Sequence, residues 1–239
     1  MSDIITFNTE QTQTNPGDPW DHLPPEQWVE KQVEWGEANI SGSGLLKHIQ
    51  KLKGPIIGAE IGVCLGVTTE LYASEIENLT KLYAIDHYPS FVDWNGTVVS
   101  AERQACMKEH ARNRLARFDN IEFRYTTSEE FVSTIEDNSL DFIFIDGDHS
   151  YEGVKQDFEL YSQIMNDKGI IIIHDTDSEY EDSLIVSEDA KKDYHSFDGP
   201  SKFVDELEKN PLYNLIKLHN FRILPNKPAS TGITIINKR

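Results

Sequence analysis

After residue 54 the chain alternates short apolar runs with longer segments whose apolar residues recur every three or four positions. The short runs predict strands covered on both faces, and the longer segments predict amphipathic helices. The predicted strands are 56–61, 81–86, 121–125, 140–145, 169–174, 214–219 and 232–237, and the predicted helices are 68–77, 99–116, 128–135, 153–165 and 201–209. This order predicts a doubly wound α/β domain with a mostly parallel seven-stranded sheet, closed by an antiparallel hairpin of the last two strands at one edge.

The first part of the chain follows a different pattern. Residues 1–18 are polar with almost no large apolar groups, and we expect a flexible tail there. Residues 19–53 contain two predicted helices, 26–37 and 45–52, which we expect to form a lid or docking segment before the domain at 54–239. The aromatic residues of these helices could also form the contact of a homodimer.

The charge of the chain narrows the choice of partners. Its 239 residues have a formal net charge of −19, which opposes binding to nucleic acid or to an anionic membrane surface. The basic segment 103–117 is best interpreted as the solvated face of a helix. No apolar run is long enough to span a membrane, and the two cysteines do not indicate a disulfide framework. We therefore expect a cytoplasmic protein.

Candidate chemistry begins at the turn after the first strand, because ligands bind at the carboxyl ends of strands in open α/β sheets. Gly62 and Gly66 would let the backbone bend tightly there, and Thr68 or Thr69 could cap the next helix. Asp86 ends the second strand, where a carboxylate can accept hydrogen bonds from ribose hydroxyls. The alternative is a turn that serves packing alone.

The sequence of the same turn helps to decide which of two classes of nucleotide-like ligand binds there. A dinucleotide-binding turn reads G-x-G-x-x-G, but Cys64 occupies the middle position, and Glu60 brings negative charge toward the place of a pyrophosphate. S-adenosylmethionine has no phosphate, and it carries a sulfonium and an ammonium group that a carboxylate attracts. The acidic turn therefore favours the methyl donor.

Two later segments carry a family resemblance. They are Leu140-Asp-Phe-Ile-Phe-Ile-Asp-Gly-Asp-His-Ser-Tyr-Glu-Gly-Val and Gly169-Ile-Ile-Ile-Ile-His-Asp. Together with Glu60-x-Gly-x-x-x-Gly and Ile85-Asp-His, they resemble the Rossmann-like class I methyltransferases over about residues 54–176. Within that class the chain resembles the macrocin-type sugar O-methyltransferases and, more distantly, catechol O-methyltransferase.

The resemblance implies a donor site. In it, Glu60, Gly62 and Gly66 shape the methionine pocket, Asp86 binds the ribose, and Ser128 lies beside the adenine. The positions expected to bind S-adenosylmethionine are Glu60, Gly62, Gly66, Thr68, Asp86, His87, Ser128 and Asp146.

The resemblance also implies that Asp146 and Asp175 approach a divalent cation. Two carboxylates at adjacent strand ends repel one another unless a cation or proton lies between them, and Mg²⁺ binds carboxylates of this kind. Metal-dependent relatives often have Asn or Asp directly after the second aspartate. This chain has Thr176, a poorer ligand, with Asp177 one position later. The alternative is a cleft without metal, in which Asp146 contacts the donor.

His149 is the candidate general base, since an imidazole titrates near neutral pH and this residue follows Asp146 by three positions. Its alternative role is to orient the loop with Tyr151. His174 is expected to be a core residue or to stand behind the site. The acidic segment 176–199 is expected to be an active-site loop that covers the acceptor, with Trp94, Tyr180 and Tyr194 as stacking surfaces.

The resulting hypothesis is an S-adenosylmethionine-dependent methyltransferase acting on an oxygen of a small molecule, either a sugar or an aromatic hydroxyl. His149 and Asp146 are its expected catalytic residues. Two alternatives stay open: an NAD(P)-dependent oxidoreductase, and a non-catalytic module that binds S-adenosylmethionine. The sequence does not identify the acceptor.

Overall fold

The computed structural model describes residues 22–39, 43–89, 91–92, 98–177, 199–218, 221–224, 227–230 and 232–239. Its centre is a seven-stranded sheet in the order β5 (Ile121–Arg124), β2 (Leu79–Ile85), β1 (Ile56–Ile61), β6 (Leu140–Ile145), β7 (Met165–His174), β11 (Ile233–Lys238) and β8 (Tyr213–Leu218). The pairs from β5 to β7 are parallel, and β11 runs antiparallel to both β7 and β8. The predicted doubly wound sheet with an antiparallel edge is confirmed.

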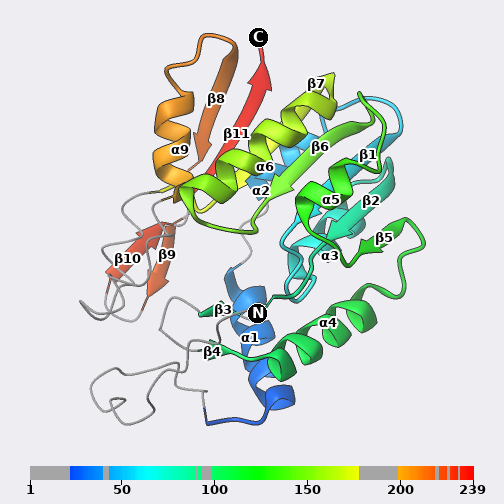
Figure 1. The fold of residues 1–239 in the computed structure, drawn as a ribbon, viewed down its shortest axis with the longest axis vertical. Helices are drawn as coiled ribbons and strands as arrows, with labels where there is room; N and C mark the ends of the chain where they lie inside the picture. The colour runs from blue at the N-terminus through cyan, green and yellow to red at the C-terminus, as the bar shows by residue number, and fades with distance from the viewer. Residues whose placement is uncertain are drawn as a thin grey trace, which may run out of the picture.

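Helices cover both faces of this sheet (Figure 1): α2 (Ser43–Ile49) and α3 (Val67–Glu75) one face, and α5 (Ser128–Val132), α6 (Tyr151–Ile164) and α9 (Gly199–Leu207) the other. Strand β6 shows why its sequence is an unbroken apolar run. Ile143 and Ile145 pack with α6, whereas Phe142 and Phe144 pack against Tyr72 of α3. Both faces are buried, so alternation with polar residues is absent.

Helix α1 (Pro25–Asn39) packs on α4 (Ala101–Leu115), near the end of the sheet where the parallel strands terminate (Figure 1). Trp28 is 3% exposed, and the Arg103 guanidinium carbon lies 4.8 Å from the centre of its ring. Arg103 is therefore buried, which corrects the prediction that the basic segment is wholly a solvated face. The same cluster includes Leu65 of the β1–α3 turn and Tyr88 after β2, so α1 rests on the loops that follow the first two strands.

The element boundaries differ from prediction mainly around β7, which begins at Met165 instead of 169. β7 pairs with β6 at Met165 and again from Ile170, with a register shift between them, and there the Asn166 amide donates a hydrogen bond to the Asp141 carboxylate of β6. Two short hairpins were not predicted: β3 (Phe91–Val92) with β4 (Val98–Val99), and β9 (Phe221–Leu224) with β10 (Lys227–Ser230).

Some predicted features lie outside the described residues: the tail 1–18, Trp94, Tyr180, Tyr194, and nearly all of the acidic loop 176–199. In the described part of the chain, no helix combines the length and apolarity needed to cross a bilayer.

Candidate functional site

The turn between β1 and α3 requires glycine at two positions. Gly62 has a φ of +88°, and a Cβ added there would lie 2.1 Å from the carbonyl oxygen of Asp146. Gly66 has a φ of +73° and is the N-cap of α3. Gly62 thus allows the β1 and β6 exit loops to pass in contact, which places the predicted donor turn directly beside Asp146.

The predicted threonine cap is wrong. The N-cap of α3 is Gly66, which has no side chain to accept a hydrogen bond, and the Thr69 hydroxyl within the helix donates to Glu60 Oε2 at 2.5 Å. Glu60 is 1% exposed, and burial raises its pKa to about 8; the nearby charges of Asp146 and Asp86 add to this shift, while the Thr69 hydrogen bond opposes it. Glu60 is therefore mostly protonated at neutral pH unless a positive charge lies near it.

Asp86 follows β2, and both of its carboxylate oxygens accept backbone hydrogen bonds. Cys64 N–H donates to Oδ2 at 2.9 Å and Tyr88 N–H donates to Oδ1 at 2.7 Å. Burial raises the pKa of Asp86, against these hydrogen bonds. A carboxylate has about four acceptor sites, so this one can still accept from two hydroxyls. His87 is exposed beside it.

Tyr88 ties this loop to the donor turn and was missed from the sequence. Its hydroxyl donates to the carbonyl oxygen of Cys64 at 2.9 Å. Tyr88 and Cys64 both have left-handed backbone conformations, with φ of 50° and 51°. Such conformations are unfavourable for residues with a Cβ and persist where surrounding contacts hold them. We call this pair of contacts, from Tyr88 to Cys64 and from Cys64 to Asp86, the Tyr88 clasp.

Ser128 is the first residue of α5, and its hydroxyl donates to the carboxylate of Asp157 on α6. The Tyr161 hydroxyl donates to the Ser128 carbonyl at 3.0 Å. Asp157 is 5% exposed, and burial raises its pKa to about 6 against the Ser128 hydrogen bond. Asp157 was also missed, although its spacing of three from Val154 and four from Tyr161 puts it on the apolar face of the predicted helix, which was a usable signal.

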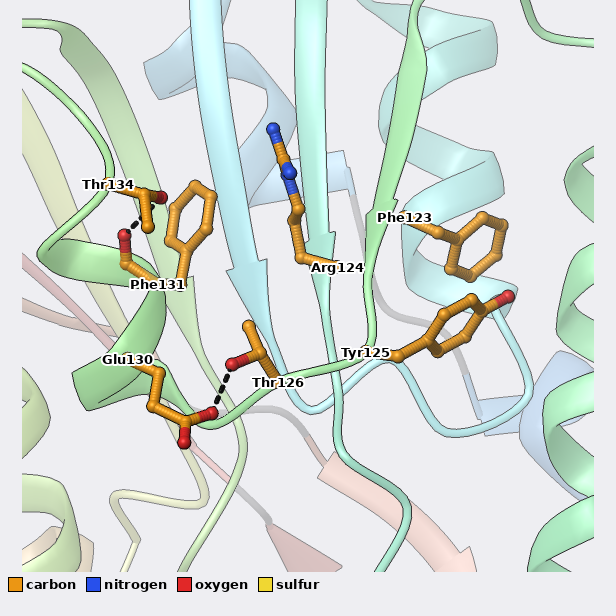
Figure 2. Close-up of a pocket in the computed structure, with 7 residues that line it drawn as sticks. All are labelled: Phe123, Arg124, Tyr125, Thr126, Glu130, Phe131 and Thr134. Atoms are coloured by element: carbon orange, nitrogen blue, oxygen red, sulfur yellow. Dashed lines mark hydrogen bonds between the residues drawn. The ribbon is translucent and has the colours of Figure 1, made fainter.

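A hollow of about 440 Å³ opens where β5 leads into α5 (Figure 2). Its lining residues are Phe123, Arg124, Tyr125, Thr126, Glu130, Phe131 and Thr134. Thr126 donates a hydrogen bond to Glu130 across it. None of the predicted catalytic residues lines this hollow. It borders the segment leading to Ser128 and is not the place where Asp146 and His149 meet.

The predicted catalytic residues converge at the ends of β6 and β7. His149 Nε2 lies 3.2 Å from Asp146 Oδ1, and His149 Nδ1 lies 3.6 Å from Asp175 Oδ2. His174 Nδ1 lies 3.2 Å from Asp146 Oδ1 and 3.1 Å from Asp175 Oδ1. These four residues form one group, the Asp–His cluster. His174 belongs to it through its contacts with both aspartates.

Electrostatics in the Asp–His cluster favour charged imidazoles. Burial alone would lower the pKa values of His149 and His174, but Asp146 and Asp175 raise both, that of His174 well above its usual range. The same two histidines hold the pKa of Asp146 well below its usual value, although burial opposes this. The two carboxylates and the two imidazoles of this cluster thus each favour the charged form of the other.

The loops around the cluster are fixed by short-range contacts. Thr176 does not face the cluster through its hydroxyl, which accepts a hydrogen bond from Thr234 of β11 at 2.9 Å. On the other side, a Cβ added at Gly199 would lie 2.2 Å from the carbonyl oxygen of His149. The start of α9 therefore packs directly on the loop that carries His149.

Comparison with known proteins agrees with this geometry. Residues 59–176 match a protein family described as a methyltransferase domain. A curated protein of Sinorhizobium fredii, y4gI, is 37% identical over 51 residues, which are 21% of this chain and 6% of that protein. The chain thus covers only a small part of this relative's length.

The solved structures with a similar fold include two O-methyltransferases. One is a putative caffeoyl-CoA O-methyltransferase from Staphylococcus aureus, with 19% identity, a TM-score of 0.59, and coverage of 88% of this chain and 92% of that one. The other is an O-methyltransferase from Bacillus cereus in complex with S-adenosylhomocysteine, with 19% identity, a TM-score of 0.55, and coverage of 91% and 93%.

Proposed function

This chain carries a class I methyltransferase domain, and from that premise we propose that it transfers the methyl group of S-adenosylmethionine to a hydroxyl oxygen of a small molecule. The observation that carries the proposal is the donor turn, where buried Glu60 and the Asp86 carboxylate flank a glycine-bent backbone. Asp86 would bind the ribose hydroxyls, and Glu60 would face the cationic end of the donor. Thr68, His87 and Ser128 complete the proposed donor site.

The donor turn argues against a dinucleotide. Glu60 and Asp86 place two carboxyl groups beside the turn, where burial above all, and then the charges of Asp146 and Asp86, raise the pKa of Glu60. A pyrophosphate would add further negative charge there. A donor with a sulfonium and an ammonium group lowers this repulsion instead. The NAD(P)-dependent oxidoreductase is therefore the weaker candidate.

The transfer itself is an in-line displacement. The acceptor oxygen forms a bond to the methyl carbon as the carbon–sulfur bond breaks, which leaves S-adenosylhomocysteine and releases the hydroxyl proton. Most of the acceleration would come from holding donor and acceptor in line, with Asp146 beside both. His149, or a cation held by Asp146 and Asp175, would assist loss of the hydroxyl proton.

The Asp–His cluster fits a bound divalent cation. Asp146, His149 and Asp175 each offer one ligand atom, and these atoms lie within 4.8 Å of one another. Asp175 Oδ1 and His174 Nδ1 are buried without a hydrogen bond of proper geometry, which is typical of atoms positioned for another partner. A cation there would lower the pKa of an acceptor hydroxyl. Thr176 is engaged with Thr234, so the third ligand sought in the sequence would be His149.

The test of the assignment is calorimetry with S-adenosylmethionine and S-adenosylhomocysteine. Both should bind, and Asp86→Ala should lose most of the affinity, whereas Asp119→Ala, at an exposed carboxylate after α4, should not. Tight binding of NADH without binding of S-adenosylmethionine would overturn the assignment. A mass-spectrometric search for added methyl groups in pools of sugars and phenols would then identify the acceptor, and failure to methylate any pool would favour the non-catalytic module.

We also infer a cytoplasmic enzyme that does not act on nucleic acid, from the acidic charge of −19 and the absence of a disulfide framework in the sequence. A homodimer through the N-terminal helices stays a proposal. Sedimentation of the purified protein tests it.

A further inference from the structure

One donor atom from each of Asp146, His149 and Asp175 can be chosen so that all three lie within 4.8 Å of one another. Neighbouring ligands of an octahedral ion with bonds of about 2.1 Å lie about 3.0 Å apart, and those of a tetrahedral ion about 3.4 Å. His149 directs Nε2 to Asp146 Oδ1 at 3.2 Å and Nδ1 to Asp175 Oδ2 at 3.6 Å, and only one of these nitrogens can bind a given ion. A small dication would therefore draw the two carboxylates toward one nitrogen of this ring.

The chemistry of the donors separates this cluster from an all-oxygen site. Mg²⁺ and Ca²⁺ prefer carboxylate, carbonyl and water oxygens, whereas imidazole nitrogen is a ligand for iron, nickel, copper and zinc ions. Here the third donor within reach of Asp146 and Asp175 is the ring of His149, and His174 lies against the same two carboxylates. The hydroxyl that would have supplied a third oxygen, that of Thr176, is turned to Thr234.

We propose that Asp146, His149 and Asp175 bind a first-row transition-metal dication in preference to Mg²⁺, with a ring nitrogen of His149 as a ligand. Three protein ligands leave positions for water and for acceptor oxygens. A catalytic role for this ion rests on the methyl transfer proposed above. His149 is then a metal ligand and not the general base.

His174 has a different place in this proposal. Its Nδ1 is close to oxygens of both aspartates without hydrogen-bond geometry to either, and it belongs to the strand end instead of the loop. We assign it to the orientation of the two carboxylates. Groups that orient metal ligands typically change metal affinity by about 10- to 100-fold when removed.

The experiment uses Co²⁺ as the probe, because it accepts imidazole and its unpaired electrons shift the resonances of its ligands. Calorimetry on the metal-free full chain should give at least tenfold tighter binding of Co²⁺ than of Mg²⁺. Proton NMR of the Co²⁺-loaded protein should show a strongly shifted, exchangeable imidazole N–H signal. His149→Gln should abolish that signal and weaken Co²⁺ binding at least tenfold, and His48→Gln, on α2, should change neither.

Each alternative outcome is decisive. Equal affinity for Co²⁺ and Mg²⁺, no binding of either ion, or a shifted imidazole signal that survives His149→Gln would overturn the proposal. Thermal unfolding of His149→Gln excludes loss of the fold as the cause. Calorimetry with S-adenosylhomocysteine on the same samples should stay within twofold of the wild type, so failure of the metal proposal is distinguishable from failure of the methyltransferase assignment.

Discussion

Replacing Tyr88 with phenylalanine tests the Tyr88 clasp by removing one hydroxyl and keeping the ring. The lost contact is the 2.9 Å hydrogen bond to the Cys64 carbonyl. A hydrogen bond of this kind contributes about 0.5–1.5 kcal/mol. It holds Cys64 in a left-handed conformation that is unfavourable by about 1–2 kcal/mol and that aims the Cys64 N–H at Asp86. Without the hydroxyl, that peptide can relax and the Asp86 carboxylate loses part of its orientation.

If the full hydrogen-bond energy is needed to prepare the donor site, Tyr88→Phe should weaken S-adenosylhomocysteine binding by roughly twofold to thirteenfold. Calorimetry measures this directly. Tyr125→Phe is the matched control, since its ring stacks on Phe123 and is 42% exposed at the neighbouring strand end. An unchanged donor affinity in Tyr88→Phe, or an equal loss in Tyr125→Phe, would refute the reasoning.

Three further predictions concern stability. Gly62→Ala should lower the unfolding free energy by more than 2 kcal/mol, because it adds a clash with the Asp146 carbonyl to a left-handed backbone. Gly54→Ala is the control, since Gly54 has a φ of +87° but open space around it, and only the backbone conformation is then unfavourable. Equal losses of stability for the two variants in urea unfolding would contradict this reasoning. Glu60→Gln should remove a pH dependence of the unfolding free energy. The pKa of Glu60 rises from 4.5 to about 8 on folding, so the folded state binds more protons than the unfolded state. Between pH 5 and 8, wild-type stability should therefore fall by up to roughly 1.4 kcal/mol per pH unit relative to the variant. A constant difference across that range would exclude the raised pKa. Trp28→Ala should lower the unfolding free energy by about 3 kcal/mol because the ring is buried between α1 and α4, and an unchanged urea midpoint would show that α1 does not contribute to global stability.

The strands could be predicted where both faces are covered. β1 and β6 begin and end as predicted because their apolar runs are bounded by proline, glycine or polar residues. The start of β7 could not be found, since Asn166 is polar and its place depends on a hydrogen bond to Asp141 in a neighbouring strand. A contact between distant residues leaves no mark in a local pattern.

The carboxylates of the site could be predicted from the sequence, but the groups that contact them could not be predicted as well. Asp86 and Asp146 end strands, so the topology alone brings them to one edge. His174 was expected to be a core residue or to stand behind the site, and the sequence does not show that it contacts both Asp146 and Asp175. The left-handed conformation of Asp175, φ 53°, turns the chain directly after His174. Thr69 was taken for a cap because the sequence does not show that Glu60 accepts its hydroxyl.

The antiparallel strand β11 lies between β7 and β8, so the last strand in the chain separates two earlier ones. One edge of β7 pairs with β6, but the other stays unpaired until β11 arrives, and such contacts between distant residues form slowly during folding. Thr234 of β11 also holds Thr176, directly after Asp175. We therefore expect the molecule to assemble in two stages: β1, β2 and β6 with Glu60, Asp86 and Asp146 first, and the Asp175 side only when β8 and β11 dock. In the folded protein, we expect β8 and β11 to unfold locally while the part that carries Glu60, Asp86 and Asp146 stays folded.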